Sequence, residues 1–113
     1  MFERVAGNLE SYMTLLSARQ KVVASNIANA DTPGYRTKDI DFQSEFQSML
    51  EGQSSPVVNE LASLPVKPDG NNVNLDREAR LLAENALRFN IASNLARGEL
   101  QTIRKAIEGG GQG

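Results

Sequence analysis

Apolar residues recur at alternating spacings of three and four along the first 30 residues of the chain. This spacing places side chains on one face of an α-helix and is typical of a coiled coil. Arg19 and Asn26 are polar members of the same series. Pro33 disfavours helical geometry in the residue before it and Gly34 suits a turn, so we expect a helix over residues 1–30. The apolar members of the stripe are Phe2, Val5, Leu9, Tyr12, Leu16, Val23 and Ala30.

The last third of the chain carries the most regular pattern. From Leu75 to Ile107 the same alternation is unbroken, and only one of its positions is polar. Asn74 can cap a helix here, and acidic residues follow in the first turn, where the helix dipole favours them. These features predict a helix over residues 74–108, followed by a flexible glycine-rich tail over residues 109–113. The stripe consists of Leu75, Ala79, Leu82, Ala86, Phe89, Ser93, Ala96, Leu100, Ile103 and Ile107.

The middle of the chain, residues 31–73, breaks both patterns. It contains all four proline residues and many serine, asparagine and glycine residues, a composition typical of turns and irregular chain. Asp41 can cap one short amphipathic helix near residues 41–50. We therefore expect a single, mostly α-helical structural domain. Its two long terminal helices pack as an antiparallel coiled-coil-like pair, and a short helix interrupts an irregular Pro/Gly-rich middle segment.

Both terminal helices carry a second apolar seam. It consists of Leu15, Ala18 and Val22 in the first helix and of Leu87, Ile91 and Leu95 in the last. One partner helix cannot cover two faces, and uncovered apolar faces on a small chain indicate further partners. A three- or four-helix bundle completed by the middle segment is the alternative, but the prolines and glycines there disfavour it. We expect self-assembly, with an isolated monomer that is partly unfolded and helices that order on assembly.

The composition excludes several kinds of chemical site. The 113 residues include no Cys and no His, which removes disulfides, thiolate metal sites and the usual neutral-pH acid/base residue. The net charge of −2 offers no concentrated basic surface for nucleic acid. Asp39, Asp41 and Glu45 have the spacing of the start of a calcium loop, but the later ligands and the glycine are missing. A hydrolase would need two carboxylates converging in a cleft. We expect no metal, no cofactor, no nucleic-acid partner and no enzymatic activity.

The first expected helix ends in a contiguous run that resembles the hallmark of the axial proteins of the bacterial flagellum, ASNIANADTPGY. Within this run, Asn26 and Asn29 can hydrogen-bond across a packed helix seam and fix its register. Pro33 and Gly34 can set a rigid exit from the helix, and Tyr35 can pack back over it. A plain helix C-cap without any role in assembly is the alternative interpretation.

Three further segments are similar to the proximal rod subunit of that family: RTKDIDF directly after the run, GNNVNLDRE at the start of the last helix, and LAENALRFN shortly after it. Residues 51–69 match the family least and are shorter than usual. The resemblance implies a structural subunit of the flagellar basal-body rod that self-assembles through its terminal helices, transmits torque and lines the export channel. Another small rod subunit, or a coiled-coil adaptor that does not polymerise, is the alternative.

The resemblance also implies partners and a location. The partners are further copies of the chain, other rod proteins, the adaptor between the rod and the MS ring, the MS ring itself and the flagellar type III export apparatus. The location is the periplasmic rod of the basal body, reached without a cleaved signal peptide. No apolar stretch approaches the about 20 residues of a membrane span, so no direct membrane insertion is expected. The residues expected at the assembly interface are Leu9, Leu16, Val23, Asn26, Ile27, Asn29, Pro33, Gly34, Tyr35, Leu82, Asn85, Phe89, Leu100 and Ile103.

Overall fold

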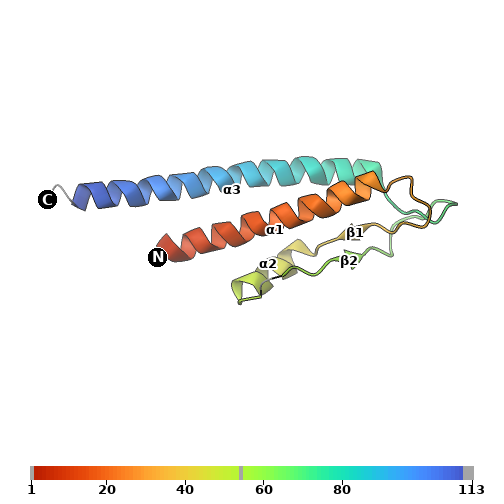
Figure 1. The fold of residues 1–113 in the computed structure, drawn as a ribbon, viewed down its shortest axis with the longest axis horizontal. Coiled ribbons are helices and arrows are strands. Elements are labelled where there is room, and N and C mark those ends of the chain that lie inside the picture. Colours follow the sequence, from red (N-terminus) through yellow and green to blue (C-terminus); the bar gives the residue numbers. More distant parts are fainter. Residues whose placement is uncertain (1, 54, 111–113) are drawn as a thin grey trace.

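The computed structural model describes residues 2–53 and 55–110, and this part of the chain is mostly α-helical. Two long helices and one short helix make up most of it, and two very short strands pair in the middle segment (Figure 1). The elements in chain order are α1 (Phe2–Ala28), β1 (Lys38–Asp39), α2 (Phe42–Leu50), β2 (Asn59–Glu60) and α3 (Leu75–Gly110). The prediction of a mostly helical fold with two long helices that pack together is confirmed.

The two long helices define an elongated molecule with extents of 72 × 25 × 16 Å. In Figure 1, α1 runs from the N-terminus to the end where the chain turns, and α3 runs back from that end. The helices are close together near the turn and separate toward the other end, where α3 extends past the start of α1. With 36 residues against 27, α3 is too long for α1 to cover it completely.

Both α2 and α3 begin at a side chain that accepts a hydrogen bond from the first turn. The Arg77 N–H donates to Asn74 Oδ1 at 3.1 Å, which makes Asn74 the cap expected from the sequence. Asp41 accepts from the Ser44 N–H in the same way and caps α2. Local hydrogen bonding therefore sets both starting points, and the sequence was sufficient to predict them.

The helix α1 ends at Ala28, two residues earlier than expected, because the chain turns sharply there. The Tyr35 N–H donates to the Thr32 backbone oxygen at 3.2 Å, and Gly34 has a φ of 76°. Pro33 and Gly34 thus occupy the central positions of a turn with the features of type II, which requires a positive φ at its second central residue.

The helix α3 continues to Gly110, so the expected start of a flexible tail at residue 109 is wrong. Each glycine costs a helix only about 1 kcal/mol relative to alanine, and adding a residue to an existing helix avoids the cost of nucleation. The remaining part of the expected tail, residues 111–113, lies outside the described residues.

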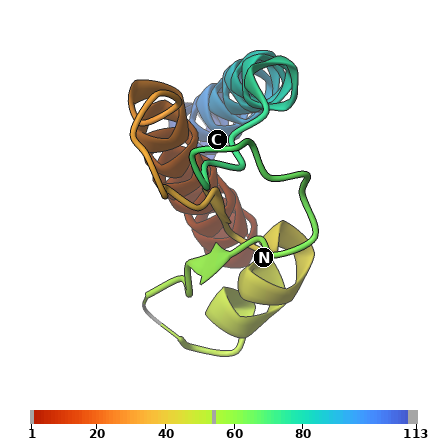
Figure 2. The same ribbon diagram turned by 90° about the vertical axis from the view of Figure 1, so that its right-hand side faces the viewer.

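The middle segment packs on α1. The Tyr12 ring of α1 lies 5.3 Å from the Phe42 ring and 5.4 Å from the Phe46 ring of α2. Leu15 lies one turn away from Tyr12 on the same side of α1 and is fully buried. Figure 2 shows α1 between α3 and the middle segment. The expectation that the second seam of α1 needs another subunit to cover it is therefore wrong at Leu15.

The helix α3 turns a different face toward α1 than its sequence pattern predicts. Its buried residues are Glu78, Leu81, Asn85 and Ala92. The regular stripe lies beside this face and is left open: Leu82 is 37% exposed, Phe89 38% and Leu100 64%. A stripe with a 3.5-residue repeat drifts around a straight helix of 3.6 residues per turn, and polar contacts at Glu78 fix the rotation of α3. The stripe is therefore only partly covered by α1 within the subunit.

Candidate assembly site

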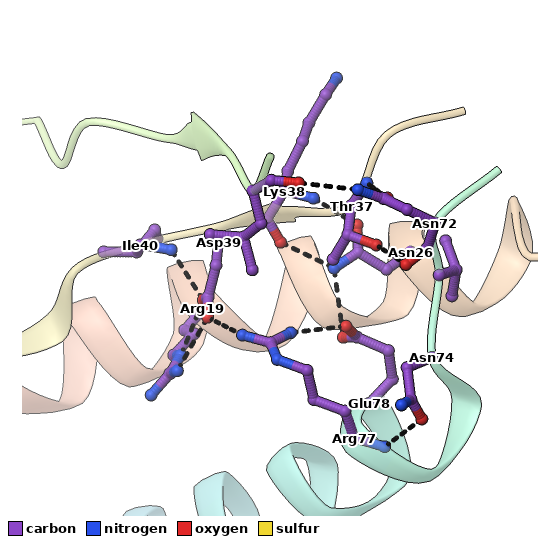
Figure 3. A network of polar contacts seen from close by, with 12 residues as sticks. Arg19, Asn26, Thr37, Lys38, Asp39, Ile40, Asn72, Asn74, Arg77 and Glu78 are labelled. Carbon is purple, nitrogen blue, oxygen red and sulfur yellow. Dashed lines mark hydrogen bonds and ion pairs between the residues drawn. The ribbon is translucent and has the colours of Figure 1, made fainter. Parts of the chain in front are cut away.

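The end of the molecule where the chain turns holds a cluster of hydrogen-bonded side chains, here called the polar junction (Figure 3). Its members come from α1, from the turn after it, from β1 and the residue directly before it, from the segment before α3 and from the start of α3. They are Arg19, Asn26, Tyr35, Thr37, Asp39, Asn71, Asn72, Arg77 and Glu78. Most of these side chains are almost completely buried. Buried polar groups are stable only when hydrogen-bonded, so their partners determine how the elements meet.

Asn26 is the centre of the polar junction. Its Nδ2 donates to the Lys38 backbone oxygen at 2.7 Å and to Glu78 Oε2 at 3.1 Å. Its Oδ1 accepts from the Lys38 N–H at 3.0 Å and from the Tyr35 hydroxyl at 2.9 Å. One amide uses its full hydrogen-bonding capacity in this way. Asn26 therefore joins α1 to β1, to α3 and to the turn, all within one subunit.

Asp39 supplies the negative charge on which both long helices converge. Arg19 of α1 donates to its two carboxylate oxygens at 2.9 and 3.0 Å, and Arg77 of α3 donates to Oδ2. Burial raises the pKa of Asp39, but the hydrogen bond from Arg19, the Ile40 N–H, the charge of Arg19 and the bond from Arg77 together outweigh it. The pKa of Asp39 therefore lies below its ordinary value of 3.8. Ionised at neutral pH, Asp39 ties β1 to α1 and α3.

Two neighbouring asparagines attach the segment before α3. Asn71 Nδ2 donates to the backbone oxygens of Asn29 and Thr32, both at 2.9 Å. These bonds satisfy carbonyl groups at and beyond the end of α1, where no helical partner is available. Asn72 Oδ1 accepts from the Thr37 N–H, and the Thr37 hydroxyl donates to the backbone oxygen of Asn72 at 3.1 Å. The chain entering α3 is thus fixed against the chain leaving α1.

Two glycines meet at the outer edge of the polar junction. Gly70 has a φ of 86°, and a Cβ atom added to it would lie 3.3 Å from the Cα of Gly34. The Gly34 N–H donates to the Asp69 backbone oxygen at 2.9 Å. The positive φ and the close approach both favour glycine at residue 70.

The hallmark residues divide into two groups in the structure. Asn26 and Tyr35 belong to the polar junction. Asn29 does not bond across a helix seam within the subunit: its Nδ2 donates to the Ser25 oxygen at 2.9 Å and its Oδ1 accepts from the Thr32 hydroxyl. Of the others, Ile27 is half-buried, whereas Pro33 and Gly34 are exposed in the turn.

Sequence reasoning missed much of the polar junction. Thr37, Asp39, Asn71, Asn72, Arg77 and Glu78 were not predicted as site residues. One signal for part of the set was Arg19, because a charged residue inside an apolar stripe predicts a buried partner of opposite charge. Asp39, considered as the first ligand of a calcium loop, is instead that partner.

The opposite end of the molecule is open. Two apolar grooves lie beside the helix pair where α1 and α3 separate. Groove A has a volume of about 410 Å³ and groove B a volume of about 630 Å³. Groove A lies between α1, α2 and α3 and is lined by Val5, Asn8, Leu9, Tyr12, Phe46, Arg88, Ile91, Ala92 and Leu95. Groove B is lined by Ala6, Glu10, Met13, Thr14, Ser17, Ala18, Lys21, Phe89 and Ala96.

Large apolar side chains of α3 are exposed on both sides of its α1-facing surface. The A flank, beside groove A, consists of Leu87, Ile91 and Leu95, which are more than half exposed. The B flank, beside groove B, consists of Leu82, Phe89 and Leu100. Of the other predicted interface residues, Leu16, Val23 and Asn85 are buried, and Leu9 and Ile103 are half-buried. Exposed apolar side chains gathered on one face are typical of interaction surfaces.

The described ranges, 2–53 and 55–110, contain no cluster of three acidic side chains arranged to hold a metal ion. No helix in these ranges is long and apolar enough to cross a membrane.

Comparison with known proteins connects these features to a family. A family model described as "Flagella basal body rod protein" matches residues 8–36, which include Asn26 and the turn after α1. The chain is 33% identical to the flagellar basal body rod protein FlgB of Salmonella typhimurium, over 87% of this chain and 88% of that protein. It is 29% identical to FlgB of Yersinia enterocolitica, over 97% and 100%, and 28% identical to FlgB of Borrelia hermsii, over 96% and 98%.

These relatives contain internal residues that this chain lacks. The alignment with the Yersinia enterocolitica protein extends over 137 positions, yet it covers 97% of a chain of only 113 residues. The chain is therefore shorter in its interior than the Yersinia enterocolitica protein.

Proposed function

The chain belongs to the FlgB family of flagellar basal body rod proteins and is a structural subunit of the rod, and we propose that it assembles with further copies through α1 and α3. The observation that carries this proposal is the exposure of apolar side chains on both flanks of α3. Burial of apolar surface drives most protein association, and a single subunit leaves this surface in water. Assembly would cover it.

In the assembled rod, α1 and α3 act as an antiparallel coiled-coil-like pair, and the irregular Pro/Gly-rich middle segment acts as an arm that contacts neighbouring subunits. Leu16, Val23, Asn26 and Asn85 hold the pair together. Ile27, Asn29, Pro33, Gly34 and Tyr35 set the direction in which the arm leaves α1. Leu9, Leu82, Phe89, Leu100 and Ile103 contact neighbours.

The long helices follow the rod, transmit torque along it and line the export channel. Besides further copies of the chain, its partners are other rod proteins, the adaptor between rod and MS ring, the MS ring and the flagellar type III export apparatus. It works in the periplasmic part of the basal body and arrives there without a cleaved signal peptide. The relatives carry the names of structural rod proteins, which agrees with a non-enzymatic role.

Mass measurement on the purified protein at rising concentration tests the proposal. We expect the species to grow beyond a dimer, because a rod subunit offers surfaces that do not close on themselves. A non-polymerising coiled-coil adaptor would stop at a dimer and would contradict the proposal, as would a monomer at every concentration.

Motility provides the matching test in cells. Leu100→Asp places a charge on an exposed side chain, so we expect it to change the free energy of unfolding by no more than about 0.5 kcal/mol but to abolish swimming. Gln101→Glu adds the same charge on the adjacent exposed residue and should leave swimming intact. A strain that swims normally with Leu100→Asp would exclude this residue from the interface.

A further inference from the structure

We propose that neighbouring subunits meet through unlike surfaces: the A flank of one copy packs on the B flank of the next. This inference rests on the rod function above and adds which surfaces pair. Successive subunits would then lie side by side in the same orientation, and each copy would use both of its flanks.

The first argument is the angular separation of the flanks. At about 100° per residue, Ile91 of the A flank and Leu82 of the B flank lie about 180° apart around α3. The buried residue Asn85 lies between them, where α1 packs. One helix of a partner can cover only one of these flanks. Two neighbours, on opposite sides, are needed to cover both.

The second argument is the polar chemistry of the two sides. Beside the B flank, a groove of about 290 Å³ is lined in part by Gln20 and Asn85. In the described part of the chain, the buried atoms Gln20 Oε1 and Asn85 Nδ2 have no hydrogen-bond partner. Groove A presents Asn8 and Arg88. Both atoms are closed to solvent within the subunit, so a second copy reaches them only when the Gln20 and Asn85 amides turn toward the groove. An arginine of the A side can then donate to the amide oxygen, and an asparagine can accept from the amide N–H.

Charge also disfavours contact between two A flanks. Arg88 is the charged residue that lines groove A, and Glu10 is one of the two that line groove B. Among the described residues neither is in an ion pair within the subunit. Contact between two A flanks would bring two arginines together, whereas contact between unlike flanks places Arg88 against a groove in which the charges of Glu10 and Lys21 cancel.

Area also favours open assembly over a closed pair. Each partner of a stable dimer buries about 800 Å², and three side chains with a groove beside them are a small part of that area. A closed dimer would use one flank twice and leave the other in water. An open series uses both flanks of every copy, so that each subunit gains contacts on two sides.

The test uses two complementary variants of the full chain and a charge-matched control. The A variant carries Leu87→Glu and Ile91→Glu, and the B variant carries Leu82→Glu and Leu100→Glu. The control carries Ala83→Glu and Gln101→Glu, each one residue beyond a B-variant position and therefore about 100° away from it around α3. All six positions are exposed, so circular dichroism should report the same helix content for each protein. Sedimentation velocity measures the mass of each protein and of a 1:1 mixture of the A and B variants.

We expect each variant alone to remain at the 12.3 kDa monomer mass, because each lacks one half of the contact. The mixture should form a species of twice that mass and stop there, since the intact B flank of one variant meets the intact A flank of the other. The control should grow with concentration like the unsubstituted protein. Self-association of the A variant into a dimer would overturn the inference, because its intact B flank would then pair with itself.

Failure of the inference is distinguishable from failure of the rod function. If the unsubstituted protein grows with concentration but the mixture stays monomeric, the pairing of unlike flanks is wrong and the function stands. If the unsubstituted protein and the control both remain folded monomers, the self-assembly proposal fails and the inference fails with it.

Discussion

The two ends of this molecule differ in what they bury. At the turn, the polar junction buries side chains such as Asn26 and Glu78 and gives them hydrogen-bond partners within the chain. At the other end, α1 and α3 separate, and side chains such as Ile91 and Leu100 lie in water. The side chains of the polar end find their hydrogen-bond partners within one subunit, whereas the apolar side chains of the other end are left uncovered by it.

This difference changes the meaning of the family hallmark. The run ASNIANADTPGY would be read from sequence as an assembly seam, yet the full hydrogen-bonding capacity of Asn26 is used inside the subunit. We infer that the hallmark first sets the geometry of one subunit, by fixing the rotation of α3 and the position of the middle segment. The regular stripe of α3 then faces outward because the polar junction holds it there.

The largest effect on subunit stability is expected from Asp39→Ala. The substitution leaves Arg19 and Arg77 without their shared partner in a mostly buried site, so the free energy of unfolding should fall by about 3 to 5 kcal/mol. Urea unfolding followed by circular dichroism measures the change. Asp31→Ala, at an exposed position in the turn, is the control and should cost less than about 1 kcal/mol.

Acid should reproduce part of that loss in the unsubstituted protein. Because the folded-state pKa of Asp39 lies below 3.8, its ionisation contributes stability above that pH, and the contribution is lost as the pH falls through the lower, folded-state value. The unfolding free energy of the unsubstituted protein should therefore fall more steeply below about pH 4 than that of Asp39→Ala. Parallel pH curves for the two proteins would show that Asp39 is not the coupled group.

A smaller effect is expected from Asn26→Ala, which leaves the Lys38 N–H and Glu78 Oε2 without this partner. We expect a loss of about 2 to 3 kcal/mol in the same unfolding measurement. Asn29→Ala is the matched control from the same hallmark, and it should cost no more than about 1 kcal/mol because its side chain bonds only near the end of its own helix. Equal losses at the two asparagines would contradict the distinction between them.

The smallest of these effects is expected from Gly70→Ala. A residue with a side chain pays about 1 to 2 kcal/mol for the left-handed backbone conformation, and the added Cβ would press on Gly34. Gly98→Ala is the control at the other end: this glycine is inside α3 with nothing within 4 Å of an added Cβ, so alanine should stabilise the protein by about 1 kcal/mol. Changes of the same sign at both glycines would contradict this account.

Local features of the fold were predictable from the sequence and longer-range ones were not. The caps at Asn74 and Asp41 and the stop at Pro33 involve residues a few positions apart, so their chemistry is visible in the sequence. The face that α3 presents to α1 depends on a bond between Asn26 and Glu78, which are 52 residues apart. Apolar periodicity could not reveal it, because the residues that decide the rotation are polar.

The candidate site shows the same division. Leu82, Phe89 and Leu100 were predicted for the interface from their regular spacing, and their exposure in the subunit leaves them available for it. Asn71 and Asn72 read as turn residues in the sequence, but they hold the two ends of the middle segment together. An amide that bonds to distant backbone groups leaves no periodic signal, so this role was visible only in three dimensions.

Amide hydrogen exchange, read segment by segment in the dilute protein and in assembled rods, tests the central claim most directly. We expect residues 25–40 and 71–80 to be protected in both states, because their hydrogen bonds are complete within one subunit. Residues 3–12 and 95–108 should exchange quickly in the dilute protein and become protected on assembly. Equal protection of the two ends in the dilute protein, unchanged by assembly, would contradict the claim. One end would then not differ from the other in having its contacts within the subunit, and a neighbour would add no contacts to the open end.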